Sequence, residues 1–190
     1  MVIFAEKITM KRLTSDEFGI LDQKLVEWYY NQAFARHNDL VRTETVITER
    51  AYSLLTIYLA ILTASVGYIL THLTVKDDLA ITAGSLAIIV FSTIAIGYIY
   101  QVIKPRPVYL SGKDPDKFNI ALYLEYFKEY PENQFNQVVC DELRDLQNKI
   151  DKQENLNLKR VHFTNLSIRF MLFGIFVSVL SFLMAFLLYQ

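Results

Sequence analysis

The chain has 190 residues, of which 53% are hydrophobic and 14% aromatic, and it carries a formal net charge of −1. This composition excludes a disordered chain and a strongly basic nucleic-acid-binding protein. The lone cysteine, Cys140, excludes an intrachain disulfide framework and fits a buried structural thiol in a reducing compartment.

The N-terminal part predicts one long helix that leads into the first apolar segment. Thr14 and Glu17 form a capping box, in which both side chains satisfy backbone N–H groups at a helix start. No proline follows before Pro105, so the helix can run unbroken from about Ser15. Apolar residues recur at helical spacing at Phe18, Leu21, Leu25 and Trp28.

Three uncharged apolar segments are long enough to cross a bilayer: Ala51–Val75, Leu79–Ile103 and Phe170–Gln190. A membrane-spanning helix needs roughly 20 apolar residues. Only the tripeptide Lys76-Asp77-Asp78 separates the first two segments, which predicts a tight transmembrane hairpin.

The segment between the second and third spans predicts a helical insert. Pro105 ends the second span because the residue before a proline avoids the helical region. We expect a short aromatic helix at about Asp116–Tyr130 and another helix from Pro131 that continues into the third span. Its apolar residues Val139, Leu143, Leu146 and Ile150 repeat at 4-3-4 spacing. Asp151–Arg160 is polar all round, which is typical of a helix that bridges solvent or lines an assembly.

These elements predict an all-α membrane protein with three transmembrane helices and long cytoplasmic helical extensions. We expect a cytoplasmic N-terminal helix at 1–50, a transmembrane hairpin at 51–103, a cytoplasmic helical insert at 104–169 and a third transmembrane helix at 170–190. The partition of basic residues predicts the orientation, because cytoplasmic loops are rich in Lys and Arg. Of the 19 such residues, only Lys76 lies in the hairpin turn. The N-terminus and the insert are therefore expected inside a bacterial inner membrane, with the C-terminus outside.

No sequence motif points to an enzyme, a cofactor or a metal. Walker A, GxGxxG, GxSxG and HExxH patterns are all absent, and the three histidines do not have metal-ligand spacing. The spans also contain no Asp, Glu, Lys or Arg, whereas ion-coupled transporters place such groups inside the membrane. The chain is therefore expected to be neither an enzyme nor a coupled transporter.

Small and hydroxyl side chains within the spans form the candidate pore or packing positions. Small residues four apart let transmembrane helices approach closely, and hydroxyl groups can equally line a pore. One hairpin and one further helix enclose no channel, so a transport path requires a homo-oligomer. The candidates are Thr63, Gly67, Ser85, Ser92, Gly174, Ser178 and Ser181.

Two basic clusters near the spans are the candidate ligand sites. The first contains Arg36, His37, Asn38 and Arg42, and the second contains Lys159 and Arg160. One interpretation is the positive-inside rule together with attraction to anionic lipids. The other is an anion site, in which guanidinium groups bind the phosphates of a nucleotide or oligonucleotide.

The chain resembles small bacterial membrane effectors of anti-phage defence, in particular those of the SLATT type. The resemblance rests on Ala35–Glu49 leading into Ala51, on the short Lys76-Asp77-Asp78 turn and on the helix after Pro131. It covers about Ser15–Arg160, and the third span is an addition to the two-span pattern. The resemblance implies an oligomeric pore-forming effector, encoded beside an enzyme that produces a nucleotide signal.

We therefore expect a homo-oligomeric inner-membrane channel, a tetramer, that acts in anti-phage defence. Its partners would be further copies of itself, the lipid bilayer and a nucleotide or oligonucleotide made by a nucleotidyltransferase-like enzyme. One alternative is a non-conducting scaffold that docks a soluble partner protein. Another is a lipid-binding or membrane-remodelling factor.

Overall fold

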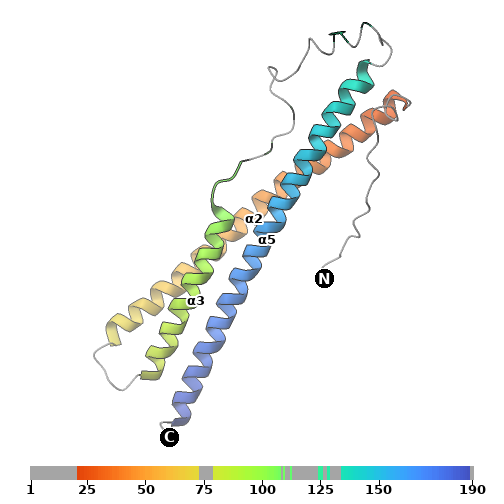
Figure 1. The fold of residues 1–190 in the computed structure, drawn as a ribbon. Coiled ribbons are helices and arrows are strands. Elements are labelled where there is room, and N and C mark those ends of the chain that lie inside the picture. Colours follow the sequence, from red (N-terminus) through yellow and green to blue (C-terminus); the bar gives the residue numbers. More distant parts are fainter. Residues whose placement is uncertain are drawn as a thin grey trace. The chain divides into compact units, whose positions relative to one another are not determined.

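The structure, a computed structural model, describes residues 21–72, 79–107 and 134–188 together with the isolated positions 109, 112, 124, 125 and 128. Within these residues the regular structure is helical and contains no strand. The three long helices are α2 (Gln23–His72), α3 (Leu79–Ile103) and α5 (Gln134–Leu188), as Figure 1 shows. The predicted all-helical fold class is confirmed.

Helix α2 is 50 residues long and passes without a break from the polar N-terminal part into the first span. Its first turn begins beside Asp22, whose carbonyl oxygen accepts hydrogen bonds from Leu25 N at 3.0 Å and Val26 N at 3.1 Å. The continuous helix that the lack of proline predicts is confirmed over this range. The capping box predicted at Thr14 and Glu17 lies outside the described residues.

Helix α3 ends where the prolines predict. The last turn closes with a hydrogen bond of 3.0 Å from Lys104 N to the Tyr100 carbonyl oxygen, and Pro105 follows directly. The Arg106 side chain returns to the helix end, where its Nη2 donates to the Gln101 carbonyl oxygen at 2.9 Å. A cation near the last carbonyl groups also suits the negative end of the helix dipole.

Helix α5 is 55 residues long and joins the insert to the third span, as predicted. It contains no proline, and Gly174 is its only glycine. Most of the predicted aromatic helix at 116–130 lies outside the described residues.

The chain forms two compact units, which we call the first unit (residues 1–38 and 109–151) and the second unit (residues 39–108 and 152–190). In the first unit, Val26 of α2 and Cys140 of α5 form a small buried core. Leu21, Val139 and Leu143 pack against this core. The expected burial of the Cys140 thiol is confirmed, with 4% of its surface exposed.

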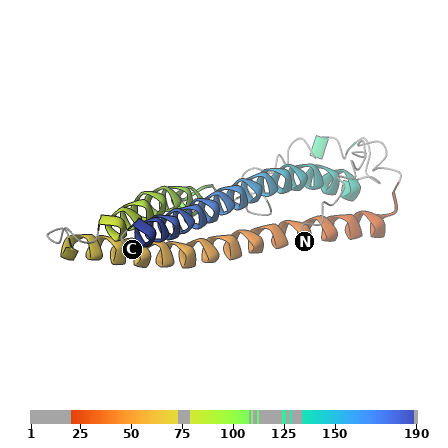
Figure 2. The same cartoon turned by 90° about the horizontal axis from the view of Figure 1, so that it is seen from below.

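In the second unit, all three helices contribute to one apolar core. Its buried members are Ile47, Ala51, Tyr58, Ala95, Ile99, Val102 and Met171. Contacts from Leu40 to Asn157 and from Glu44 to Arg160 show that α2 and α5 run parallel here, since the numbers rise together. Helix α3 runs antiparallel to α5, beside which it lies in both Figure 1 and Figure 2.

Glycines allow α3 and α5 to approach closely. A β-carbon at Gly174 would lie 2.5 Å from the Phe91 Cβ, and one at Gly84 would lie 3.0 Å from the Ser178 Oγ. Aromatic rings fill the rest of the contact. The Tyr98 ring stacks on that of Phe170 at 5.3 Å between centroids, and the Phe91 and Phe173 rings meet edge-on, also at 5.3 Å. Small and large side chains thus interlock along this pair.

All three helices are long and apolar enough to cross a membrane. Many large apolar side chains on them are exposed, such as Leu70, Leu172 and Phe182. An apolar surface of this extent suits hydrocarbon rather than water. Because α2 and α5 are parallel in the second unit, their polar parts at 39–50 and 152–169 precede the spans on the same side. Which side faces the cytoplasm stays a prediction, as do the four predicted segment boundaries.

Candidate functional site

A buried ion pair joins α2 to α5 in the polar part of the second unit. Arg160 Nη1 lies 2.7 Å from Glu44 Oε1, and the same nitrogen donates to Thr48 Oγ1 at 3.2 Å. The Arg160 side chain is 6% exposed and that of Glu44 is 18% exposed. Thr48 turns its own hydroxyl back to the helix and donates to the Glu44 carbonyl oxygen at 2.9 Å. One arginine therefore binds two acceptors on successive turns of α2.

Two amide side chains extend the ion pair along α5. Gln153 Nε2 donates to the other carboxylate oxygen of Glu44, Oε2, and lies 3.3 Å from Asn157 Oδ1. Asn157 Nδ2 donates to the Leu40 carbonyl oxygen at 2.9 Å. We call Glu44, Thr48, Gln153, Asn157 and Arg160 the polar seam.

The polar seam is almost closed to solvent. Gln153 is 0% exposed, Asn157 6% and Arg160 5%. Two of its atoms, Gln153 Oε1 and Arg160 Nε, are buried without a hydrogen-bond partner. A buried ion pair contributes little net stability, because desolvation offsets the attraction, but removal of one partner leaves a buried charge and is costly. The arrangement therefore suits fixing the position of two helices better than binding a soluble anion.

The predicted ligand residues fall into different environments. Arg36, Asn38, Arg42 and Lys159 are exposed, whereas His37 is 1% exposed and Arg160 belongs to the polar seam. Both ring nitrogens of His37 are buried without a hydrogen-bond partner. Arg36, His37 and Asn38 belong to the first unit, and Arg42, Lys159 and Arg160 belong to the second. Arg36, Arg42 and Lys159 thus keep their charged side chains at the surface.

Three of the predicted pore or packing positions are used in contacts between α3 and α5. Gly174 is buried against Phe91, and Ser178 lies beside Gly84. Ser92 is fully buried, and its Oγ donates to the Met171 sulfur at 3.5 Å.

The other predicted pore or packing positions have more open surroundings. Thr63 and Gly67 are exposed on α2, and a β-carbon at Gly67 would meet nothing within 4 Å. Ser85 and Ser181 are half-buried, and the Ser181 hydroxyl donates to the Val177 carbonyl oxygen at 2.9 Å.

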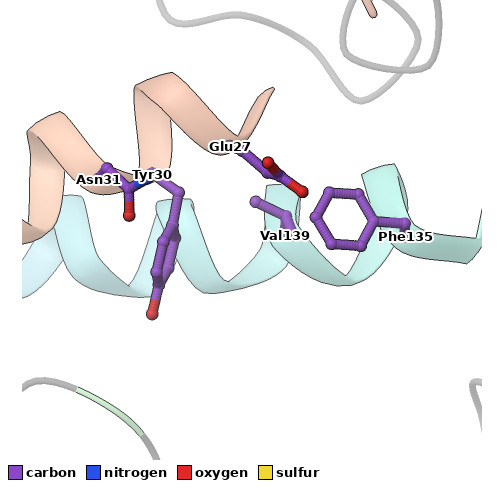
Figure 3. Close-up of a pocket in the computed structure, with 5 residues that line it drawn as sticks. All are labelled: Glu27, Tyr30, Asn31, Phe135 and Val139. Carbon is purple, nitrogen blue, oxygen red and sulfur yellow. The ribbon is translucent and has the colours of Figure 1, made fainter. Parts of the chain in front are cut away.

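The first unit contains an open hollow between the beginnings of α2 and α5 (Figure 3). Its volume is about 210 Å³, and it is lined by Glu27, Tyr30, Asn31, Phe135 and Val139. Two of its polar lining residues, Glu27 and Asn31, are exposed, and the third, Tyr30, is half-buried. Its one charged lining residue is a carboxylate, which repels phosphate.

Glu44, Gln153 and Asn157 were not among the predicted site residues, and Gln153 and Asn157 lie in the segment predicted to be polar all round. The signal that could have found Gln153 and Asn157 is their position in the 4-3-4 repeat of α5. Positions 153, 157 and 160 continue the 4-3-4 spacing of Val139–Ile150, so they lie on the same side of α5 as its apolar stripe. Polar residues at such positions are typical of coiled-coil seams in which register is specified.

Among the described residues, no three His, Cys, Asp or Glu side chains lie together in a way that could hold a metal ion.

Residues 49–188 match the family PycTM, the Pycsar effector protein domain. The chain belongs to this family. The match takes in all of α3 and α5 and the part of α2 from residue 49 onward. Comparisons with curated proteins and with solved structures find no match.

Membership in PycTM makes the chain a membrane effector of anti-phage defence that is signalled by cyclic nucleotides. Effectors of the Pycsar type respond to cyclic nucleotides made by a partner cyclase. The broad resemblance to anti-phage membrane effectors is thereby confirmed, and the SLATT type stays a prediction. The match begins just after Glu44 and Thr48, so the polar seam joins α5 residues inside it to α2 residues before it.

Proposed function

We propose that this PycTM effector is a homo-oligomeric inner-membrane channel, a tetramer, which a cyclic nucleotide opens from the cytoplasm. Opening would dissipate ion gradients across the membrane of an infected cell. The proposal includes no catalytic step, so the chain is proposed not to be an enzyme. Its partners are further copies of the chain, the bilayer and the cyclic nucleotide made by a partner cyclase.

The observation that carries the proposal is a stripe of small and hydroxyl side chains on α2. Its residues recur at 3-4 spacing, and all are exposed: Ser53, Thr56, Ala60, Thr63, Gly67 and Thr71. We call them the α2 stripe. Three of its hydroxyl groups donate to their own helix, to the carbonyl oxygens of Glu49, Tyr52 and Gly67, each at 3.1 Å. Such a surface tolerates lipid but suits a close helix neighbour or a water-filled path better.

The three spans bury little surface within one chain, which supports assembly. In the most apolar 18-residue stretch of each helix, the buried share is 6% in α2, 22% in α3 and 17% in α5. The α2 stretch is the least covered and includes most of the α2 stripe. A ridge of small residues lets backbones approach closely, so we place the contact between copies along α2.

The cytoplasmic face supplies the cations for the ligand. Lys and Arg are concentrated on the polar segments, which the positive-inside rule assigns to the cytoplasm. Arg36, Arg42 and Lys159 are exposed there, and arginine forks bind phosphate oxygens through two parallel hydrogen bonds. The cyclic phosphate is therefore proposed to meet the first basic cluster.

Ion flux from vesicles tests the proposal. Purified protein is reconstituted into vesicles loaded with a potassium-sensitive dye, and cAMP, cGMP, cCMP and cUMP are added separately. The proposal expects flux with at least one of them and little without. If none of the four opens the vesicles while the protein is shown to be inserted, the channel proposal fails.

A pair of glycine variants tests where the copies meet. Gly67 and Gly97 are both exposed, and a β-carbon added at either position would meet nothing within 4 Å. Gly67→Ile should lower both the oligomeric mass in detergent and the flux, because a bulky side chain in the α2 stripe prevents the close approach of a neighbouring helix. Gly97→Ile, on α3, is the control and should leave both unchanged. If both variants lose oligomeric mass and flux equally, the copies do not meet along α2.

Charge removal tests the ligand site. Arg36→Gln together with Arg42→Gln should abolish the response to cyclic nucleotide while leaving the oligomeric mass intact. A normal response in this double variant would make the cluster a topology signal only.

The scaffold alternative is favoured by one observation. Trp28 and Phe34 expose 53% and 38% of their surface on the polar part of α2, outside the predicted span. Exposed aromatic residues are common in protein-binding surfaces. A monomer in detergent that binds a soluble protein and conducts no ions would favour the scaffold.

A further inference from the structure

The polar seam lies in a coiled-coil pattern that continues from the cytoplasmic part into the spans. On α5, the residues facing α2 and α3 are Gln153, Asn157 and Arg160 at 4-3 spacing and, one heptad after Arg160, Ser167, Met171 and Gly174 at the same spacing. All six are buried. On α2, Glu44, Ile47, Ala51, Leu54 and Tyr58 recur at 3-4 spacing. The polar seam is therefore the polar section of a continuous heptad interface whose membrane section is mostly apolar.

Apolar heptad contacts alone leave the register of two helices weakly defined, because a slip of one heptad replaces one set of apolar contacts with another. The polar seam removes that freedom. After a slip of one heptad toward the spans, Arg160 would face Ala51 instead of Glu44. The buried guanidinium and carboxylate would then both lack their partner, which is strongly unfavourable.

The cost of opening the polar seam is at least as large as the free energy that one bound ligand supplies. A ligand at a hundred times its Kd shifts an equilibrium by about 100-fold. Removing one partner of a buried ion pair shifts an equilibrium by about 100-fold to several thousand-fold. A cyclic nucleotide that had to separate Glu44 from Arg160 would therefore have little or no free energy left to open a channel.

We propose that the polar seam locks α2 and α5 of the second unit in one register, so that the two helices move as one rigid body when the effector changes state. The lock itself follows from the contacts of the seam. Only its use in opening rests on the proposed channel function. Opening then occurs by movement of α2–α5 pairs relative to one another in the oligomer, and the seam stays closed throughout.

A charge exchange tests the lock. The variants are Arg160→Met, the double variant Glu44→Arg with Arg160→Glu, and Arg169→Met as the control, because Arg169 is an exposed arginine of the same helix. Gln153 can bond to either charge at position 44. Its amide nitrogen donates to Glu44, and its Oε1, which has no partner, can accept from an arginine there. Unfolding in detergent is measured for each, together with flux from vesicles with and without cAMP, cGMP, cCMP and cUMP.

We expect Arg160→Met to lower the folded-to-unfolded ratio by about 100-fold and the charge exchange to restore it to within about 10-fold of the original chain. Arg169→Met should change it by less than about 3-fold. Ligand-triggered flux should fall at least about 10-fold in Arg160→Met, because the pair no longer moves as one body, and return in the exchange.

Other outcomes overturn the inference. Flux without ligand in Arg160→Met would show that the seam opens during activation. Normal ligand response and stability in Arg160→Met would show that it locks nothing, as would failure of the exchange to restore either readout. If the original chain conducts no ions, the channel proposal fails alone, since the unfolding measurements still decide whether Glu44 and Arg160 are coupled.

Discussion

Replacing Gly174 with alanine tests how closely α3 and α5 approach. The added carbon would lie 2.5 Å from the Phe91 Cβ and 3.0 Å from its Cγ. Both atoms are near the backbone, so rotation of the Phe91 ring does not remove the clash and the helices must separate. Overpacking of this kind costs about 1–3 kcal/mol, while replacing a helical glycine with alanine returns about 1 kcal/mol. We expect a net destabilisation of up to about 2 kcal/mol.

Thermal unfolding in detergent, followed by circular dichroism, measures this effect. A chain of this size loses about 2–4 °C in Tm for each kcal/mol, so Gly174→Ala should lower the Tm by up to about 8 °C. The control is Gly97→Ala, where an added β-carbon meets nothing within 4 Å and the Tm should stay the same or rise. Equal Tm values for the two variants would refute the close approach at Gly174.

Three further substitutions or reactions probe single features of the structure. Ser167→Ala should raise stability by up to about 1 kcal/mol, because the Ser167 Oγ is buried without a partner, and a lower Tm would contradict this. Gly112→Ala should cost about 1–2 kcal/mol by the same measurement, since Gly112 has a φ of +88°, whereas no loss would mean that this conformation is not required. Cys140 should react with a maleimide only as fast as the first unit opens, because its side chain is buried, and labelling at the rate of a free thiol would contradict that core.

The helices were predictable because each rests on a local signal. Long stretches without proline predict the continuity of α2, and Pro105 predicts the end of α3. The length of the apolar segments predicts the spans. The continuation of the insert into the third span was predictable for the same reason, since nothing between Pro131 and the end of α5 breaks a helix.

The partners of the polar residues were not predictable from local signals. Arg160 was expected in a basic ligand site because it adjoins Lys159, whereas its pairing with Glu44 depends on how α2 and α5 align. The composition of 151–160 indicates a helix that is polar all round. Only the continuation of the 4-3-4 spacing from the neighbouring apolar stripe shows which of those residues face α2. Likewise, Gly174 and Gly67 look alike in sequence, yet only Gly174 is packed against another helix of the chain.

Single-channel recording in planar bilayers decides whether the effector forms a pore that a cyclic nucleotide opens. Purified effector is added to one side, and current is recorded while cAMP, cGMP, cCMP and cUMP are supplied in turn to the side that carries the polar segments. We expect discrete, uniform current steps with one of these nucleotides, and loss of the steps in Gly67→Ile but not in Gly97→Ile. A silent bilayer with every nucleotide, or a graded leak without unitary steps, would contradict a ligand-opened pore.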